Sequence, residues 1–553
     1  MQVRRLAVVA GAAFALTLGL FNVTSPAAAQ GAAALVGAVT SAEEGPMEGV
    51  IVSAKKDSST ITVSIISNAQ GRYSFPASRL EPGRYSLQIR AVGYDLEGPK
   101  AAEVKAGEPA TADLKLRKTR NLSKQLTNAE WMMSVPGSDD DKLQLINCVS
   151  CHTLERVVKS THDADEFVQV IARMNGYAQV SQPIKPQRRV DQSRAANPER
   201  FRKVAEYLAT INLSSGMKHE FDLKTLPRVK GRGTNVIITE YDLPRPTIEP
   251  HDVIIVNGEA WYSNFGEQFL GKIDPKTGKH TEYAMPELRK GFPTGNLDLG
   301  VDRDGNLFLG MMYQAGVAKF DPKTEKFQIW QLPPERLRDD SQLNMVTNQA
   351  HVDGKLWVND AGPSTLFRLD LATGKFEEFD PLSVLPGDRR GYSIYDVRAD
   401  SQNNVYVTDF QKNYVIRVDA KTGKFTAYQT GTPFSRNRRG RIDDQDRFWF
   451  AEYRGNKIAM LDTKEERIQE WPLPTKFTQP YDVIWDKNGD LWTGGMTTDR
   501  VVRLNPKSGE AVEYPLPRDT NMRRMFVDNS TKPPTFWVGS NHGASIVRVE
   551  PLD

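Results

Sequence analysis

The second half of the chain repeats one short pattern, and this repeat constrains the fold more than any other feature. In each unit an apolar residue precedes Asp, Asn or Glu, as in Ile273-Asp274, and a turn and an extended stretch usually follow. The pattern occurs seven times, at intervals of 47, 49, 49, 43, 43 and 45 residues. Repeats of roughly 40–50 residues with four short strands each are typical of propeller blades. The repeat therefore predicts a seven-bladed β-propeller over residues 235–553.

The two ends of this array predict how the ring closes. After Val549-Glu550 the sequence has no room for the outer strand that follows each of the other six units. Residues 237–243 have the outer-strand pattern, but no other strand of a blade precedes them. We therefore expect residues 237–243 to complete the seventh blade and to remove the exposed sheet edges of the ring.

Parts of this array resemble the virginiamycin B lyase family of seven-bladed propellers, and the resemblance covers residues 235–553. The segments that carry it are residues 449–452 (WFAE), 456–458 (NKI) and 513–517 (EYPLP). It implies a metal-assisted general base that opens a lactone by elimination, with a Glu-x-His pair in the channel. This chain departs from that pair, because Arg454 follows Glu452 at this spacing and Ser540 precedes His542. The resemblance implies the fold but not the lyase chemistry.

Both cysteines of the chain belong to one motif, Cys148-Val149-Ser150-Cys151-His152. This spacing is the attachment signature of c-type haem. Two thiols two residues apart reach the two vinyl groups of the porphyrin, and the adjacent imidazole becomes the proximal iron ligand. The alternatives are a surface disulfide, a thioredoxin-like redox motif, which needs a βαβ setting, and a zinc site, which needs more ligands. We predict one covalently bound haem c, attached through Cys148 and Cys151 and ligated by His152.

The sequence around this motif has helical periodicity on both sides of a loop that contains prolines. Residues 141–216 resemble the small cytochrome c domains, including a closing helix with Tyr207 and Leu208. For the sixth iron ligand we predict Met174, because it shares an apolar helix face and its thioether is a ligand type found in such domains. Met217, His162 and an open coordination site are the alternatives.

Three further segments complete the predicted organisation. Residues 1–29 have the charged start, apolar stretch and Ala-Ala-Ala site of a signal peptide, so we expect a periplasmic or secreted protein with no membrane span in the mature chain. Residues 34–117 alternate short β-rich runs with turns, and Gly71-Arg72-Tyr73, Pro82-Gly83-Arg84-Tyr85 and Gly93-Tyr94 resemble the carboxypeptidase regulatory-like family. Residues 118–140 are a polar linker. The predicted fold class is thus multidomain and mainly β: a small β-sandwich, a small all-α cytochrome c domain and a seven-bladed β-propeller.

The residues that line the propeller channel provide the candidate substrate site. Four blades place an acid near the start of the innermost strand, for which we expect a structural role: Asp252, Asp298, Asp396 and Asp482. His251, Tyr395 and Tyr481 stand beside these acids, and two blades carry arginine pairs there: Arg438-Arg439 and Arg523-Arg524. Converging arginines would bind an anionic group, and ion pairs with the recurrent aspartates are the alternative.

Three functions remain open on these grounds. The first is a periplasmic electron-transfer cytochrome whose haem is coupled to binding or oxidation of a small anionic molecule in the channel and which exchanges electrons with a redox partner protein. The second is a metal-assisted lyase with His251, Glu452 and His542 as acid and base groups. The third is a non-enzymatic electron carrier with two binding modules. A nucleic-acid partner is not expected, because the formal net charge is only +3 and no basic run or stripe is present.

Overall fold

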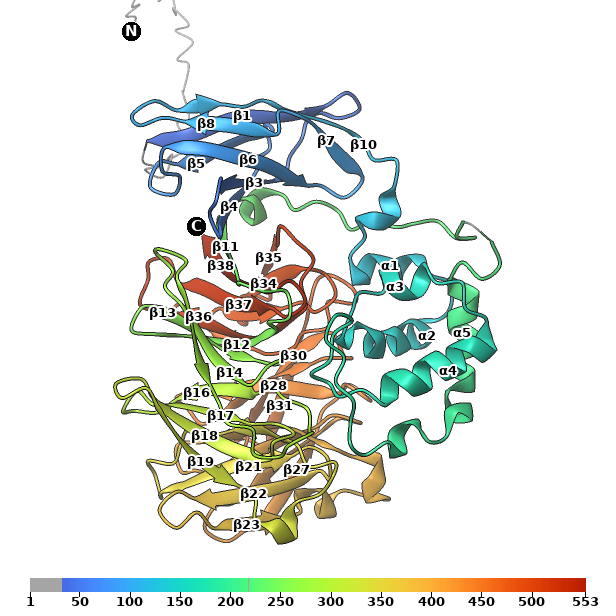
Figure 1. Cartoon of the computed structure of the whole chain (residues 1–553), viewed down its shortest axis with the longest axis vertical. Helices are drawn as coiled ribbons and strands as arrows, with labels where there is room; N and C mark the ends of the chain where they lie inside the picture. Colours follow the sequence, from blue (N-terminus) through green and yellow to red (C-terminus); the bar gives the residue numbers. More distant parts are fainter. Residues whose placement is uncertain (1–31, 217) are drawn as a thin grey trace, which may run out of the picture.

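The protein has three parts, which are a β-sandwich, a helical region and a ring of seven sheets (Figure 1). The computed structural model describes residues 32–216 and 218–553. The expected signal peptide and Met217 lie outside the described residues. Within these residues, no helix combines the length and apolar character needed to cross a bilayer.

The β-sandwich packs two sheets around a core that includes Leu35, Val52 and Phe75, all of them fully buried or nearly so. The first sheet contains β1 (Ala33–Ser41), β2 (Gly45–Pro46), β5 (Arg72–Pro76), β7 (Tyr94–Gly98), β9 (Ala110–Thr111) and β10 (Leu114–Lys118). The second contains β3 (Ile51–Lys56), β4 (Ile61–Ile66), β6 (Gly83–Arg90) and β8 (Ala101–Val104). The predicted sandwich is thus present, and alternating apolar residues supply its interior.

The helical region lies against one face of the ring (Figure 1). Its α-helices are α1 (Asn128–Ser134), α2 (Asp139–Leu143), α3 (Glu155–Val158), α4 (Ala164–Asn175) and α5 (Arg202–Ile211). Short 3₁₀ turns lie at η1 (Leu122–Lys124), η2 (Gln144–Ser150), η3 (Ser193–Ala195) and η4 (Pro198–Phe201). Only α4 and α5 reach ten residues. The fold therefore shows a small, partly irregular helical region, and it does not by itself identify a cytochrome c domain.

The stretch expected to be a linker, residues 118–140, differs from that prediction. It contains η1 and α1, and α1 begins with a capping box in which Thr127 and Glu130 bond each other's backbone N–H groups. Trp131 of α1 is fully buried in the same core as Phe167 and Leu208. This segment belongs to the helical region because its apolar residues complete that core.

Each blade of the ring is a four-stranded antiparallel sheet, numbered here in chain order. Blade 1 contains β12 (Pro250–Val256), β13 (Glu259–Asn264), β14 (Phe269–Ile273) and β15 (His280–Ala284). Blade 2 contains β16 (Leu297–Val301), β17 (Leu307–Gly310), β18 (Gly316–Asp321) and β19 (Lys326–Gln331). Blade 3 contains β20 (Leu343–Val346), β21 (Lys355–Asp360), β22 (Thr365–Asp370) and β23 (Phe376–Phe379). Blade 4 contains β24 (Ile394–Ala399), β25 (Val405–Asp409), β26 (Tyr414–Val418) and β27 (Phe425–Gln429).

The last three blades follow the same order from the channel outward. Blade 5 contains β28 (Asn437–Ile442), β29 (Phe448–Glu452), β30 (Lys457–Asp462) and β31 (Arg467–Pro472). Blade 6 contains β32 (Ile484–Trp485), β33 (Leu491–Gly494), β34 (Arg500–Leu504) and β35 (Ala511–Pro515). Blade 7 combines β36 (Met522–Asp528), β37 (Thr535–Ser540) and β38 (Ser545–Pro551) with β11 (Val236–Asp242), which comes from the start of the array.

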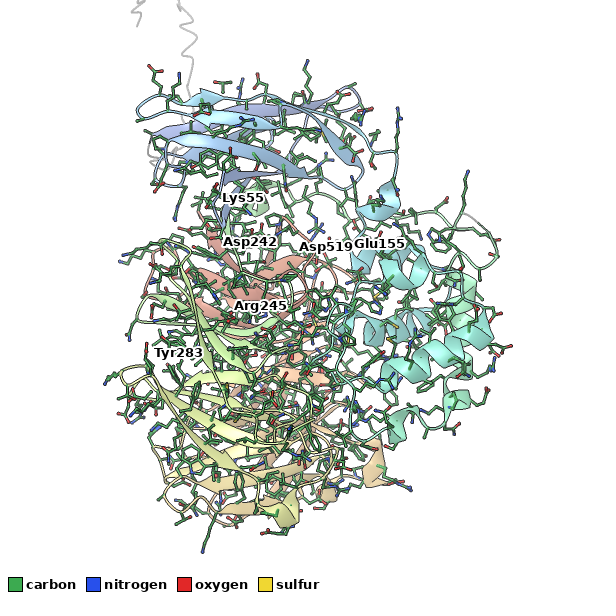
Figure 2. The ribbon with its side chains drawn as sticks, in the orientation of Figure 1. Lys55, Glu155, Asp242, Arg245, Tyr283 and Asp519 are labelled. Atoms are coloured by element: carbon green, nitrogen blue, oxygen red, sulfur yellow. The ribbon has the colours of Figure 1, made fainter. Side chains whose placement is uncertain are left out.

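The ring closes as predicted, through antiparallel pairing of β11 with β38 from Val236–Pro551 to Asp242–Ser545. The other edge of β11 pairs with β4 of the sandwich, so that the sandwich sheet and blade 7 form one continuous sheet. Lys55 and Asp242 reinforce this junction with an ion pair of 2.5 Å, and Figure 2 shows the two side chains where the domains meet. The closing strand is therefore covered on both edges.

Candidate functional site

The cysteine motif lies directly on the face of the propeller. The motif segment, residues 146–152, runs through η2 and docks on blades 5 and 7. Asn521 donates to the carbonyl of Val149 over 3.0 Å, and Arg523 donates to the carbonyl of Ser150 over 3.0 Å. From blade 5, Tyr453 donates to the carbonyl of Ile146 over 3.4 Å. Figure 2 shows Glu155, just after the segment, beside Asp519, whose pKa is raised to about 6 by burial and by surrounding acids that include Glu155.

The two thiols of the motif are not in a disulfide, and one ring nitrogen of His152 has no hydrogen-bond partner among the described residues. Cys148 and Cys151 are free and partly buried, and burial raises the pKa of each thiol to about 11. Redox-active Cys-x-x-Cys thiols instead have lowered pKa values. His152 places Nδ1 2.9 Å from the carbonyl oxygen of Thr153. Because a carbonyl only accepts, Nδ1 carries the proton, and burial lowers the pKa of His152, so that Nε2 has a free lone pair.

Four aspartates and four arginines fill the channel as an ion network. Arg439 lies 3.0 Å from Asp252 and 2.5 Å from Asp298, and Arg524 lies 3.1 Å from Asp252 and also contacts Asp298. The remaining pairs are Arg398 with Asp298 and Asp396, at 3.1 and 2.8 Å, and Arg441 with Asp482, at 3.1 Å. Burial alone would raise the pKa of Asp298, but Arg398, Arg524 and Arg439 hold it at about 2. Arg439 and Arg524, predicted to bind substrate, are thus placed in ion pairs with the recurrent aspartates.

The other two arginines of the predicted site have different surroundings. Arg438 and Arg523 are 6% and 5% exposed, and neither has a carboxylate within ion-pair distance among the described residues. Arg438 lies 3.8 Å from the ring centroid of Tyr453 and 4.7 Å from that of Tyr481, and it contacts the sulfur of Met496 at 3.1 Å. Arg523 lies 5.5 Å from the ring of Tyr481.

The tyrosines of the predicted substrate site join His251 in a buried hydrogen-bonded chain. His251 Nδ1 contacts the carboxylate of Asp252, and its Nε2 lies 3.0 Å from the hydroxyl of Tyr481. Tyr395 donates to the Tyr481 hydroxyl over 2.8 Å. Burial lowers the pKa of His251 to about 3, and the hydrogen bond and charge of Asp252 only partly offset this effect. His251 is therefore neutral near pH 7, with both ring nitrogens engaged.

The other candidate acid and base groups are placed apart from this chain. His542 Nε2 lies 3.0 Å from the carbonyl of Ser150, so it donates its proton to the motif segment, and burial lowers the pKa of His542 to about 4. Glu452 is fully buried in blade 5, where burial and the nearby charge of Glu470 raise its pKa to about 8. Its neighbours Thr432 and Lys457 belong to the same part of the ring. The described residues contain no group of three or more His, Cys, Asp and Glu side chains arranged to hold a metal ion.

Met174 differs from its predicted inward orientation. It lies in the last turn of α4 and is 40% exposed, whereas Phe167 of the same helix is buried. Met174 therefore does not belong to the part of the apolar face of α4 that packs into the core. His162, an alternative ligand, lies 3.3 Å from Glu166 at the start of α4.

Several residues at this site were not predicted from the sequence, including Arg398 and Arg441 of the ion network, Glu249 and Asn521. Glu249 precedes the blade 1 strand, is 1% exposed, and has a pKa of about 8, because its burial outweighs the charges of Arg523 and Lys185. The negative charge of Glu249 also contributes to the raised pKa of Cys151. Asn521 holds the carbonyl of Val149, as described above. For Glu249 and Asn521 the only sequence signal was position, since each directly precedes an innermost strand.

The comparisons with known proteins agree with this geometry. Residues 384–552 match the virginiamycin B lyase family, and residues 34–117 match the carboxypeptidase regulatory-like domain. The carboxypeptidase regulatory-like resemblance is confirmed over its whole predicted range, and the lyase resemblance is confirmed over residues 384–552. The family match begins before blade 4, and the sheets of blades 1 to 3 continue the lyase-like propeller to the full ring. Comparison with curated protein sequences gives no significant match.

One solved structure supports the propeller fold. A streptogramin B lyase structure is 21% identical, with a TM-score of 0.50, and the match covers 58% of this chain and 99% of that chain. Selenomethionine-substituted virginiamycin B lyase from Staphylococcus aureus is 20% identical, with a TM-score of 0.48, and the match covers 57% of this chain and 98% of that chain. At these identities the likeness concerns the fold alone.

Proposed function

We propose that this protein is a periplasmic monohaem c-type cytochrome that carries single electrons, with the lyase-like propeller as the platform on which its haem segment is held. One observation carries the proposal. Cys148 and Cys151 are free thiols, and the adjacent His152 keeps the lone pair of Nε2 available while the Thr153 carbonyl fixes its other nitrogen. A hydrogen bond of this kind from the second ring nitrogen orients a ligating histidine and sets its tautomer.

The residues present fit a covalently attached haem. Cys148 and Cys151 would hold it by thioether bonds, and His152 would bind its iron. When bound, the group supplies one-electron transfer. Asn521 of the propeller holds the motif segment in place. The raised pKa values of the two thiols disfavour the alternative of a redox-active disulfide. Residues 141–216 are accordingly proposed to be a cytochrome c domain, and α1 contributes to its core.

The electron-carrier role is favoured over turnover of an anionic molecule in the channel. Arg439 and Arg524 are neutralised by aspartates, while Arg438 is buried among propeller side chains and Arg523 is buried against the carbonyl of Ser150. The lyase role needs an accessible general base in the channel, but Asp252 and Tyr481 occupy both ring nitrogens of His251, and Glu452 is fully buried in blade 5. The expected partner is a redox protein that donates or accepts one electron.

Covalent attachment tests the proposal directly. The full chain is produced with its export signal in a host that matures c-type cytochromes, then denatured and extracted with acid acetone. We expect the protein to keep a pyridine haemochrome and to gain the mass of one haem. Cys148→Ala with Cys151→Ala should lose both signals, whereas His542→Ala, which alters only the propeller contact, should keep them. A haem that extracts into the solvent, or an exported chain without haem, would refute the proposal.

A further inference from the structure

Neighbouring arginines in blades 5 and 7 face opposite environments. Arg439 and Arg524 point into the ion network, where Asp252 and Asp298 balance their charges. Arg438 and Arg523 contact the motif segment or the aromatic residues beneath it, and no acid lies within ion-pair distance of either in the described chain. Two buried positive charges therefore remain uncompensated on the side of the propeller that meets the cysteines.

A third arginine, Arg436, adds positive charge on the same side of the propeller, and we call Arg436, Arg438 and Arg523 together the arginine wall. Arg436, in the loop before β28, donates to the side-chain oxygen of Asn147 over 3.0 Å and lies 4.3 Å from the ring of Phe410. Burial, together with the repulsion of Arg438 and Arg454, lowers the pKa of Arg436 to about 10. It also has no carboxylate partner in the described chain. Arg436 and Arg523 thus contact the motif segment directly, and Arg438 lies against Tyr453, which bonds the carbonyl of Ile146.

The acid closest to this wall does not cancel its charge. Glu249 interacts with Arg523, yet its burial keeps it largely protonated at neutral pH. The wall therefore keeps a net positive charge. Its arginines are buried, where charges interact more strongly than in water and where salt screens them less.

We infer that the positive charges of Arg438 and Arg523 raise the reduction potential of the haem that the motif segment carries. The inference rests on the proposed function. A positive charge near the iron disfavours the ferric form, which has one more positive charge than the ferrous form, and so favours uptake of one electron from a donor protein. The propeller would thus set the potential through charge without binding a substrate.

Potentiometric titration of the full-length holoprotein with redox mediators tests this inference. Arg438→Gln and Arg523→Gln should each shift the midpoint potential to more negative values, and the double variant should shift it further. Arg438→Lys and Arg523→Lys keep the charge and should stay near the wild-type value. A glutamine at a buried position changes packing as well as charge, so Arg436→Gln, at a half-buried loop position, gives an independent test with a shift of the same sign.

Arg454→Gln is the matched control. Arg454 lies in the same blade but is partly exposed, and Asp140 neutralises it at 2.7 Å. Removing it should leave the potential unchanged. Equal potentials in the glutamine variants and the wild type would overturn the inference, and so would an equal shift in the lysine and glutamine variants, which would indicate packing. A wild-type protein without covalent haem would instead refute the proposed function, since no potential would then be measured.

Discussion

His542 Nε2 donates a hydrogen bond to the carbonyl oxygen of Ser150 over 3.0 Å. Ser150 stands between the two cysteines, and His542 follows β37 in the last blade. The helical region and the propeller therefore meet at this one peptide group. Arg523 donates to the same oxygen. The motif segment and the propeller therefore form one structural unit, and a change in either is expected to affect the other.

We expect His542→Ala to weaken this unit. The carbonyl of Ser150 would keep the bond from Arg523 and would therefore not be left without a partner, so the loss of one hydrogen bond is expected to cost about 0.5–1.5 kcal/mol. Chemical denaturation followed by tryptophan fluorescence measures the change in the free energy of unfolding. His280→Ala, a comparable change at the outer strand of blade 1, is the control for a general effect of losing a histidine. An unchanged unfolding midpoint would show that the contact adds no stability.

The ion network predicts a larger effect at Asp298. Three arginines contact this fully buried carboxylate. Asp298→Asn removes the negative charge and leaves buried guanidinium groups undercompensated, which is expected to cost about 3–5 kcal/mol. Thermal unfolding compared with Asp302→Asn, at a turn on the surface, measures the difference. A loss below about 1 kcal/mol would mean that the network relaxes or admits water.

Glu452 predicts a dependence of stability on pH. Its pKa of about 8 in the folded protein lies above the ordinary value of 4.5, so the folded state binds more protons than the unfolded state between these values. The contribution of Glu452 to stability is present below pH 4.5 and is lost as the pH rises through about 8. Glu452→Gln cannot ionise, and its stability relative to wild type should therefore increase across this window.

Urea unfolding at several pH values between about 5 and 8.5 measures this effect. Glu470→Gln is the control of opposite sign, because Glu470 pairs with Lys457 at 2.6 Å and its pKa is lowered despite partial burial. That variant should lose stability at neutral pH. A difference between Glu452→Gln and wild type that is independent of pH would contradict the raised pKa.

Met174 remains the predicted sixth ligand of the iron. With Met174 bound, the oxidised protein should show the weak near-infrared band of sulfur-ligated low-spin haem. Met174→Ala should lose this band and lower the reduction potential, because thioether ligation favours the ferrous state. Its 40% exposure shows that the side chain is not fixed by core packing. Loss of the band in Met217→Ala, with Met174→Ala unchanged, would reassign the ligand.

The parts of the fold that could be predicted from the sequence are those with a signal in neighbouring residues. The repeat of apolar-acidic steps and the outer-strand pattern of residues 237–243 predicted the ring and its closure, since both depend on spacing along the chain. The helix α1 was missed because polar residues on either side masked Trp131, although Thr127 and Glu130 already formed a capping-box pattern.

The site was less predictable, because its residues meet only through the ring. Adjacent arginines are indistinguishable in the sequence, yet Arg439 reaches Asp252, 187 positions away, while Arg438 turns toward Tyr453. The contact of His542 with Ser150 spans 392 positions. Periodicity indicates which strand a residue belongs to, but not which neighbour neutralises its charge.

The double pairing of β11 has a consequence for the rate of folding. Its partner β38 lies at the opposite end of the propeller array, so the closing contact must bring together the two ends of the array, and such distant pairings form slowly. The sandwich precedes both strands in the chain, and β4 already pairs with β11. If the sandwich folds before the propeller, β4 holds β11 in place in advance. Ring closure then consists of adding β38, together with its neighbour β37, to the free edge of β11.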